Sequence, residues 1–213
     1  MTDSTGTKTA LVDHSRRRLL TAATAGIGAV GVVFAAVPFI ASWQPSERAK
    51  ALGAPVTVDA SKLEDGQMLK VVWRGQPVFV VRRSKAVVAA LGNHNHLLAD
   101  PNSDGSVQPS YIKDSGAARA RNPEYWVGLA VCTHLGCSPL GAFVPNDAYQ
   151  LSGTDLGSTW PGGFYCPCHG SKFDISGRVF KSVPAPKNLA VPSYAFVGDA
   201  RIVIGVDESP RNS

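Results

Sequence analysis

The chain has 213 residues, of which 44% are hydrophobic and 17% are charged, and its formal net charge is +5. This composition is typical of a folded globular protein and excludes an intrinsically disordered chain. The basic residues form no stripe with interleaved aromatic side chains, so the positive charge does not predict a nucleic-acid partner.

An arginine triplet, Arg16–Arg18, precedes a stretch from Leu19 to Ser46 that contains no charged side chain. A transmembrane helix needs roughly 20 apolar residues, and this stretch is long enough. Positive charges stay on the cytoplasmic side of a membrane. We therefore predict a cytoplasmic tail over 1–18, a single membrane anchor over 19–43, and a head on the opposite side. A long buried core helix is the alternative, but such a helix rarely lacks a polar face.

The segment Ser15–Leu20 also resembles a twin-arginine export signal, a route that transports proteins already folded. No clear small-residue cleavage site follows the apolar stretch, so we expect an uncleaved signal anchor. The glycines of Gly26–Gly31 match the dinucleotide pattern GxGxxG, but they lie inside the predicted span. Small residues there more simply allow helices to approach one another closely.

Residues 44–55 are polar and bracketed by prolines, which is typical of a linker. An ordinary connector and a hinge for a moving head are both compatible with this segment. The head is predicted over 56–207, followed by a short tail at 208–213. Its ends carry β-branched, apolar runs that predict strands at Val56–Val58, Met68–Trp73, Val78–Val81, Tyr194–Val197 and Arg201–Val206.

Turn residues at 74–77 and 198–200 join four of these runs into two hairpins. Two hairpins at opposite ends of the head suggest one antiparallel sheet closed by its termini. Between them, 92–123 predicts only one or two helical turns, and Val144–Trp160 resembles an insertion of turns without an assigned role. His94, His96 and His14 occur in polar sequence, which favours solvated imidazoles over metal ligands.

All four cysteines fall in two short motifs, together with two of the five histidines. The first motif, Cys132–Cys137, reads CTHLGC, and the second, Cys166–Ser171, reads CPCHGS. Each motif pairs a cysteine with a histidine and adds a further cysteine, which indicates a metal centre with mixed ligands. Zinc is an alternative, although zinc motifs usually pair like ligands, as C-x₂₋₄-C and H-x₃₋₅-H.

Both motifs resemble those of the Rieske iron–sulfur proteins of cytochrome bc complexes. The resemblance implies one [2Fe–2S] cluster, with Cys132 and Cys166 on one iron and His134 and His169 on the other. Two neutral imidazoles in place of two thiolates make the oxidised cluster formally neutral. Its reduction potential is therefore higher than that of an all-cysteine cluster, which suits quinol oxidation.

The same resemblance implies a disulfide between the remaining cysteines, Cys137 and Cys168, which an oxidising periplasm permits. Two free buried thiols are the alternative. Rieske oxygenases and their ferredoxins usually lack this second pair of cysteines, and the chain is too short to add a catalytic non-haem iron domain. The resemblance therefore excludes the oxygenase branch.

Residues that flank the ligands also match the family. Ser171 occupies a position whose hydroxyl donates to a bridging sulfide, and Phe173 replaces a tyrosine that bonds a cysteine ligand in many members. Because donors to the cluster sulfurs raise the potential, we expect a potential below that of tyrosine-bearing relatives.

Two further segments would surround the cluster. Leu135 and Gly136 would lie at the exposed tip of the first loop, and Pro184-Ala-Pro186 resembles the proline loop that covers the cluster. The implied fold is mainly β: a single N-terminal transmembrane helix and a Rieske-type antiparallel β-sheet head. A cluster-binding subdomain, about 126–187, would be inserted into that sheet.

The implied function is that of the Rieske subunit of a bacterial quinol:cytochrome c oxidoreductase of the bc1 type. His169 and His134 are the expected catalytic residues, and His169 would accept a hydrogen bond from ubiquinol bound at the cytochrome b subunit. A ligand imidazole would take a proton as the cluster takes one electron. The electron would pass to the c-type cytochrome subunit, coupled to proton translocation. We expect a single-pass protein of the bacterial inner membrane with a periplasmic head, within a dimeric complex and without nucleic acid.

Three other functions remain open at this point. The chain could be the Rieske subunit of another periplasmic enzyme, of the arsenite oxidase type, or of a cytochrome bf complex that oxidises plastoquinol. A zinc-binding structural protein is the third possibility, and it would be colourless.

Overall fold

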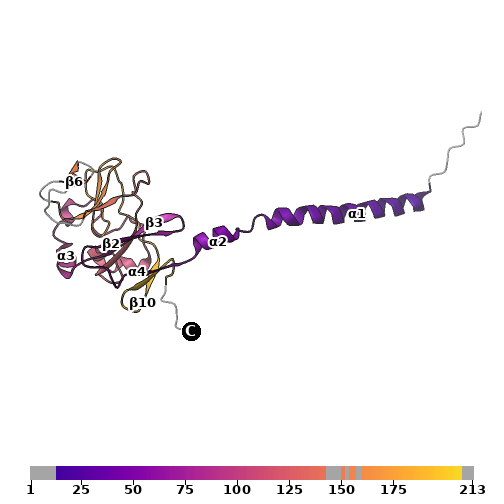
Figure 1. The fold of residues 1–213 in the computed structure, drawn as a ribbon. Coiled ribbons are helices and arrows are strands. Elements are labelled where there is room, and N and C mark those ends of the chain that lie inside the picture. The colour runs from indigo at the N-terminus through magenta and orange to yellow at the C-terminus, as the bar shows by residue number, and fades with distance from the viewer. Residues whose placement is uncertain (1–12, 143–149, 152–153, 157–159, 208–213) are drawn as a thin grey trace, which may run out of the picture. The chain divides into compact units, whose positions relative to one another are not determined.

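The computed structural model describes residues 13–142, 150–151, 154–156 and 160–207. The chain divides into two units, Met1–Lys50 and Ala51–Ser213. The first unit contains helix α1 (His14–Ala41), whose 28 residues would span about 42 Å at 1.5 Å per residue (Figure 1). This length exceeds the roughly 30 Å of a hydrocarbon core. α1 has no buried residue in the described structure and is apolar enough to cross a membrane.

The beginning of α1 is stabilised by a side-chain cap. The carboxylate of Asp13 accepts hydrogen bonds from the backbone N–H groups of Ser15 and Arg16, which have no partner within the helix. α1 starts before the predicted span of 19–43 and ends two residues short of it. The bounds of the anchor stay a prediction.

A second helix, α2 (Glu47–Gly53), lies within the predicted linker, where composition did not indicate a helix. The hydroxyl of Ser46 accepts a hydrogen bond from the backbone N–H of Ala49, and Lys50 forms an ion pair with Glu47 at 2.7 Å. Local capping and an (i, i+3) ion pair therefore favour helix in a polar segment. The hinge role of 44–55 stays a prediction.

The head contains three three-stranded antiparallel sheets and one two-stranded pair among the residues described. The first sheet has the order β1 (Val56–Asp59), β11 (Arg201–Ile204), β10 (Tyr194–Val197), and the second has the order β2 (Met68–Trp73), β3 (Gln76–Arg82), β4 (Tyr125–Leu129). The third has the order β5 (Leu140–Ala142), β8 (Gly163–Cys166), β9 (Ser171–Asp174), and the pair is β6 (Gln150–Leu151) with β7 (Thr154–Asp155). The short helices are α3 (Lys85–Ala90), η1 (Asn95–Leu97), α4 (Ser110–Lys113) and η2 (Gly116–Ala118).

Strand β3 lies at the centre of its sheet and between two hydrophobic cores. Val78 and Val80 belong to the core shared with β1, β10 and β11, whereas Phe79 and Val81 belong to the core shared with β8 and β9. Successive side chains of a strand point to opposite faces, so both faces of this sheet are covered. This double coverage explains why 78–81 reads as a continuous apolar run without alternation.

The observed pairing differs from the single sheet that we expected. β1 pairs with β11, so the ends of the head do meet, but the β2–β3 hairpin pairs with β4 in a separate sheet. The turn of that hairpin is shorter than predicted. It consists of Arg74 and Gly75, with φ of 51° and 72°, so Gln76 and Pro77 already belong to β3. Two positive φ values are typical of tight two-residue hairpin turns, whose twist matches that of the strands.

Gly163 begins β8 at a point where the backbone of β9 approaches closely. Its φ is 152°, and a Cβ at this position would lie 2.1 Å from the carbonyl oxygen of Phe173. The β8–β9 hairpin, which carries the second cysteine motif, therefore requires glycine here.

We expect Gly163→Ala to lower the free energy of unfolding by about 3 kcal/mol, because the clash is with backbone that cannot move aside. Thermal denaturation of the detergent-solubilised protein, followed by circular dichroism, measures the change. Gly92→Ala is the matched control, since a Cβ at Gly92 meets no atom within 4 Å. Equal melting temperatures for the two variants would contradict this account.

Candidate metal centre

The two cysteine motifs form two loops of similar construction. The first follows β4 and precedes β5, and the second connects β8 to β9. Within the first loop, the N–H of Gly136 donates to the carbonyl of Cys132, and the N–H of Cys132 donates to the carbonyl of Cys137. In the second, the N–H of Gly170 donates to the carbonyl of Cys166 at 2.9 Å. Gly136 and Gly170 both have positive φ, 84° and 78°, which glycine adopts without strain.

A disulfide joins the two loops. Cys137 and Cys168 are bonded, with an S–S distance of 2.10 Å and a Cα–Cα distance of 6.7 Å. The predicted pairing is confirmed. Cys132 and Cys166 are free thiols, and both are buried.

The two free thiols lie together in the core beneath the loops. Burial raises the pKa of the Cys166 thiol, and the neighbouring Cys132 thiol contributes to this increase. The sulfur atoms of Cys137, Cys166 and Cys168 lie within 4.8 Å of one another, but the disulfide removes Cys137 and Cys168 as thiolate ligands. Two adjacent buried thiols in an apolar environment are a donor pair that a bound iron would stabilise as thiolates.

The two histidines of the motifs face each other on the outer side. Their ring centroids are 4.8 Å apart and the rings are nearly perpendicular, at 86°. His169 is exposed and His134 is half-buried, in contrast to the buried Cys132 and Cys166. The structure therefore places the two free thiols together in the core and the two imidazoles together on the outer side of the same two loops, and their role as ligands stays a prediction. This donor set fits a cluster with two thiolate and two imidazole ligands.

The tip of the first loop is open to solvent. Leu135 is 71% exposed, and Gly136 beside it is also exposed. A large apolar side chain held in solvent next to a metal centre is a feature that often marks a contact surface.

The proline loop, defined here as Val183–Leu189, contacts both cysteine loops. The hydroxyl of Thr133, in the first loop, donates to the carbonyl of Lys187 at 2.6 Å. The backbone N–H of Ala185 donates to the hydroxyl of Ser171, at the end of the second loop where β9 begins, at 3.1 Å. With the disulfide, every pair among the three loops is linked. Sequence reasoning missed Thr133, because its partner lies far along the chain.

The prolines themselves, Pro184 and Pro186, are exposed, whereas Ala185 between them is buried. Ser171 is fully buried, and its hydroxyl accepts the Ala185 N–H, which leaves the hydroxyl hydrogen free to donate. Phe173, also fully buried, packs in the same core as Cys132 and Cys166. A tyrosine in its place would bring one further donor into this core.

Known proteins match both parts of the chain. The family model described as Rieske [2Fe-2S] domain matches residues 113–195, and the model described as Ubiquitinol-cytochrome C reductase Fe-S subunit TAT signal matches residues 7–46. The ubiquinol-cytochrome c reductase iron-sulfur subunit of Allochromatium vinosum is 52% identical over 196 residues, which cover 92% of this chain and 91% of that protein. The chain belongs to the family of ubiquinol–cytochrome c reductase iron–sulfur subunits.

Less similar relatives of this iron–sulfur subunit are also named as iron–sulfur or Rieske subunits. The subunit of Rhodospirillum rubrum is 41% identical over 194 residues, covering 91% of this chain and 93% of its own. The mitochondrial cytochrome b-c1 complex subunit Rieske of Schizosaccharomyces pombe is 36% identical, covering 96% of this chain and 75% of its own.

Membership in this family shows which cofactor the chain binds. The Rieske domain holds a [2Fe–2S] cluster, so the zinc alternative is wrong. The arsenite oxidase and cytochrome bf alternatives receive no support from these relatives, whereas the bc1 assignment does. The match to an export-signal model, together with α1, indicates a membrane-anchored iron–sulfur subunit with an exported head.

His94 lies in a different environment from the solvated one that its polar sequence suggested. Its side chain is only 15% exposed, its Nε2 is 3.4 Å from a carboxylate oxygen of buried Asp174, and its ring stacks with Phe180. Burial alone would raise the pKa of Asp174, but His94 and Arg178 together lower it below its usual value. His96 is exposed. No sequence signal could reveal the position of His94, because its partners lie about 80 residues away.

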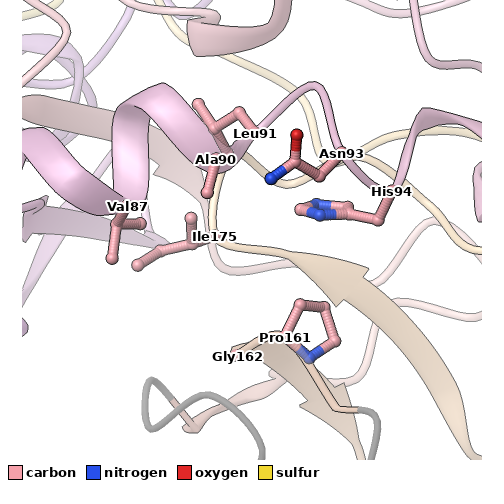
Figure 2. Close-up of a pocket in the computed structure, with 8 residues that line it drawn as sticks. All are labelled: Val87, Ala90, Leu91, Asn93, His94, Pro161, Gly162 and Ile175. Carbon is pink, nitrogen blue, oxygen red and sulfur yellow. The ribbon is translucent and has the colours of Figure 1, made fainter.

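A pocket of about 220 Å³ adjoins His94, outside the three loops that surround the metal centre. Figure 2 shows the imidazole between Asn93 and Pro161, with apolar side chains at the other end. The pocket is lined by Val87, Ala90, Leu91, Asn93, His94, Pro161, Gly162 and Ile175.

The disulfide should contribute measurably to the stability of the iron–sulfur subunit. Its cysteines are 31 residues apart, and closing a loop of this length stabilises the folded state by about 3.5 kcal/mol in the chain-entropy model. We expect the double variant Cys137→Ser, Cys168→Ser to lose the visible absorption of the cluster at a lower urea concentration. A reducing agent should lower the midpoint of the unaltered protein similarly. Unchanged midpoints in both experiments would disprove this role.

Proposed function

We propose that this chain oxidises ubiquinol, accepting one electron at a time and passing each to a c-type cytochrome, as the Rieske subunit of a cytochrome bc1 complex. The observation that carries the proposal is the division of the metal centre into a buried thiol side and an outward imidazole side. A substrate would meet the imidazole side, because His169 is exposed and the two free thiols lie in the core.

The proposed ligands are Cys132 and Cys166 for one iron and His134 and His169 for the other. The free state of the two buried thiols and the 4.8 Å separation of the two rings support this set. When bound, the cluster supplies a one-electron acceptor whose potential the histidine ligands raise.

His169 is the proposed contact for quinol. Its ring is exposed, so the nitrogen that does not bind metal can accept a hydrogen bond from a quinol hydroxyl and then hold the proton. Leu135 provides an exposed apolar side chain on the neighbouring loop, suited to the ring of the substrate or to the apolar wall of its binding site. His134, which is half-buried, would serve mainly as a ligand.

We also propose that α1 crosses the bacterial inner membrane once, with residues 1–18 in the cytoplasm and the head in the periplasm, joined by 44–55. The arginine triplet at 16–18 supports this orientation through the positive-inside bias. The disulfide supports it independently, since such bonds persist in oxidising compartments. The proposed partners are the cytochrome b and c-type cytochrome subunits of a dimeric complex.

Electron paramagnetic resonance of membranes reduced with ubiquinol tests this function. We expect a Rieske signal in the membrane fraction, and an inhibitor bound at the quinol site of the cytochrome b subunit should change its shape. The inhibitor should also stop reduction of the c-type cytochrome. A Rieske signal that is insensitive to the inhibitor would refute the bc1 assignment, and a signal in the soluble fraction would refute the anchor.

The substitution Phe173→Tyr tests the tuning of the cluster. If the new hydroxyl bonds a cysteine ligand, the midpoint potential should rise by on the order of 50 mV, which corresponds to one hydrogen bond of about 1 kcal/mol. A redox titration followed by circular dichroism gives this value.

Phe164→Tyr is the matched control, because Phe164 pairs directly with Phe173 across the β8–β9 hairpin and is equally buried. It reports the effect of adding an oxygen to the core without the hydrogen bond. An unchanged midpoint in Phe173→Tyr would show that the missing hydroxyl does not tune this cluster.

A further inference from the structure

Three arginines lie inside the head, where charged groups are costly. Arg83, Arg119 and Arg178 are each no more than 1% exposed, and Asp174 is the one carboxylate among the buried residues that the structure describes. Arg178 pairs with Asp174 at 2.7 Å. The other two guanidinium groups have no such partner in the described structure, and a buried cation without one requires full hydrogen bonding by other groups.

The backbone conformation of Arg119 is also unfavourable. It has φ of 47° and ψ of 45°, the left-handed conformation that residues with a side chain rarely adopt. Burial also lowers the pKa of its guanidinium to about 10. A residue that is strained and buried at once often has a specific structural task. Its contacts identify that task.

The guanidinium of Arg119 joins two segments that belong to the metal centre. Nη1 donates to the carbonyl of Ser176 and Nη2 donates to the carbonyl of Leu189, both at 2.9 Å, while Nε donates to the side chain of Gln108. Ser176 lies in the turn that follows β9, and Leu189 ends the proline loop. The planar fork of arginine suits two carbonyls side by side.

The proline loop is held at both ends. At its front, Ala185 and Lys187 make the hydrogen bonds to Ser171 and Thr133 described above. At its back, Leu189 is bonded to Arg119 and also donates its N–H to the carbonyl of Gly177. The position of Leu189 therefore restricts the positions of Ala185 and Lys187, since only three residues separate Ala185 from Leu189.

We propose that Arg119 is a positioning residue for the metal centre. Its fork fixes the back of the proline loop to the turn after β9, and this holds the front of the loop on the two cysteine loops. The irregular segment 92–123 therefore has a role, because it places the guanidinium of Arg119 beneath the proline loop. The inference rests on the proposed ligand set.

Hydrogen exchange in the full-length, cluster-containing protein tests the proposal with Arg119→Lys. Lysine keeps the positive charge but loses the planar fork. We expect amides in 183–191 to exchange at least about tenfold faster, as for loss of a buried hydrogen bond. The cluster's electron paramagnetic resonance spectrum and midpoint potential should shift in the same sample.

Arg83→Lys is the matched control. Arg83 is as buried as Arg119 and carries the same charge, but its donors bind the carbonyls of Ala118 and Pro123 and the hydroxyl of Ser176, not the proline loop. We expect this variant to lose stability without faster exchange in 183–191 and without a spectral shift. Equal effects of the two variants would overturn the proposal, because they would indicate general destabilisation.

Two further outcomes test separately whether Arg119 holds the proline loop and whether the loop positions the metal centre. Normal exchange in 183–191 of Arg119→Lys would show that the fork does not hold the loop. Faster exchange with an unchanged spectrum and midpoint would show that the loop does not position the centre, whatever the substrate of the complex. If Arg119→Lys does not accumulate, Arg119→Gly, which suits the left-handed backbone, should give the same faster exchange.

Discussion

The metal centre depends on a closed set of links among three loops. The disulfide joins the two cysteine loops, Thr133 joins the first to the proline loop, and Ser171 joins the second to it. Three loops linked in pairs restrict one another, so the thiols can stay buried while the imidazoles stay outside. With the proposed ligands, this division would place the cluster in the core and would leave His169 exposed at the surface.

The strands beneath the loops provide the rigid support for this arrangement. Strand β3 contributes alternate side chains to two cores, so the cluster-side sheet and the terminal sheet are both packed on one central sheet. The β8–β9 hairpin then places the second cysteine loop at its end, and Gly163 allows its strands to approach closely. Buried arginines complete the support, because long polar side chains reach carbonyls that no strand can pair.

Much of the site could be predicted from the sequence, because its chemistry is carried by local motifs. Cysteines and histidines at short fixed spacing predict the ligand set, which stays a prediction. The Cys137–Cys168 disulfide followed from the family resemblance and is confirmed. Met68–Trp73 and Tyr194–Val197 were predicted with the bounds observed. The separate sheets could not be predicted, since hairpins show which strands pair locally but not which sheets they join.

Sequence alone determined the ligand motifs, the apolar anchor and the strand runs, since each is a property of neighbouring residues. Tertiary structure decided what depends on residues far apart: the link from Thr133 to Lys187, the burial of His94 against Asp174, and the fork of Arg119 beneath the proline loop. The physical reason is that a buried polar group must find its partner wherever the fold places one. Nothing in its own neighbourhood along the chain indicates where that partner lies.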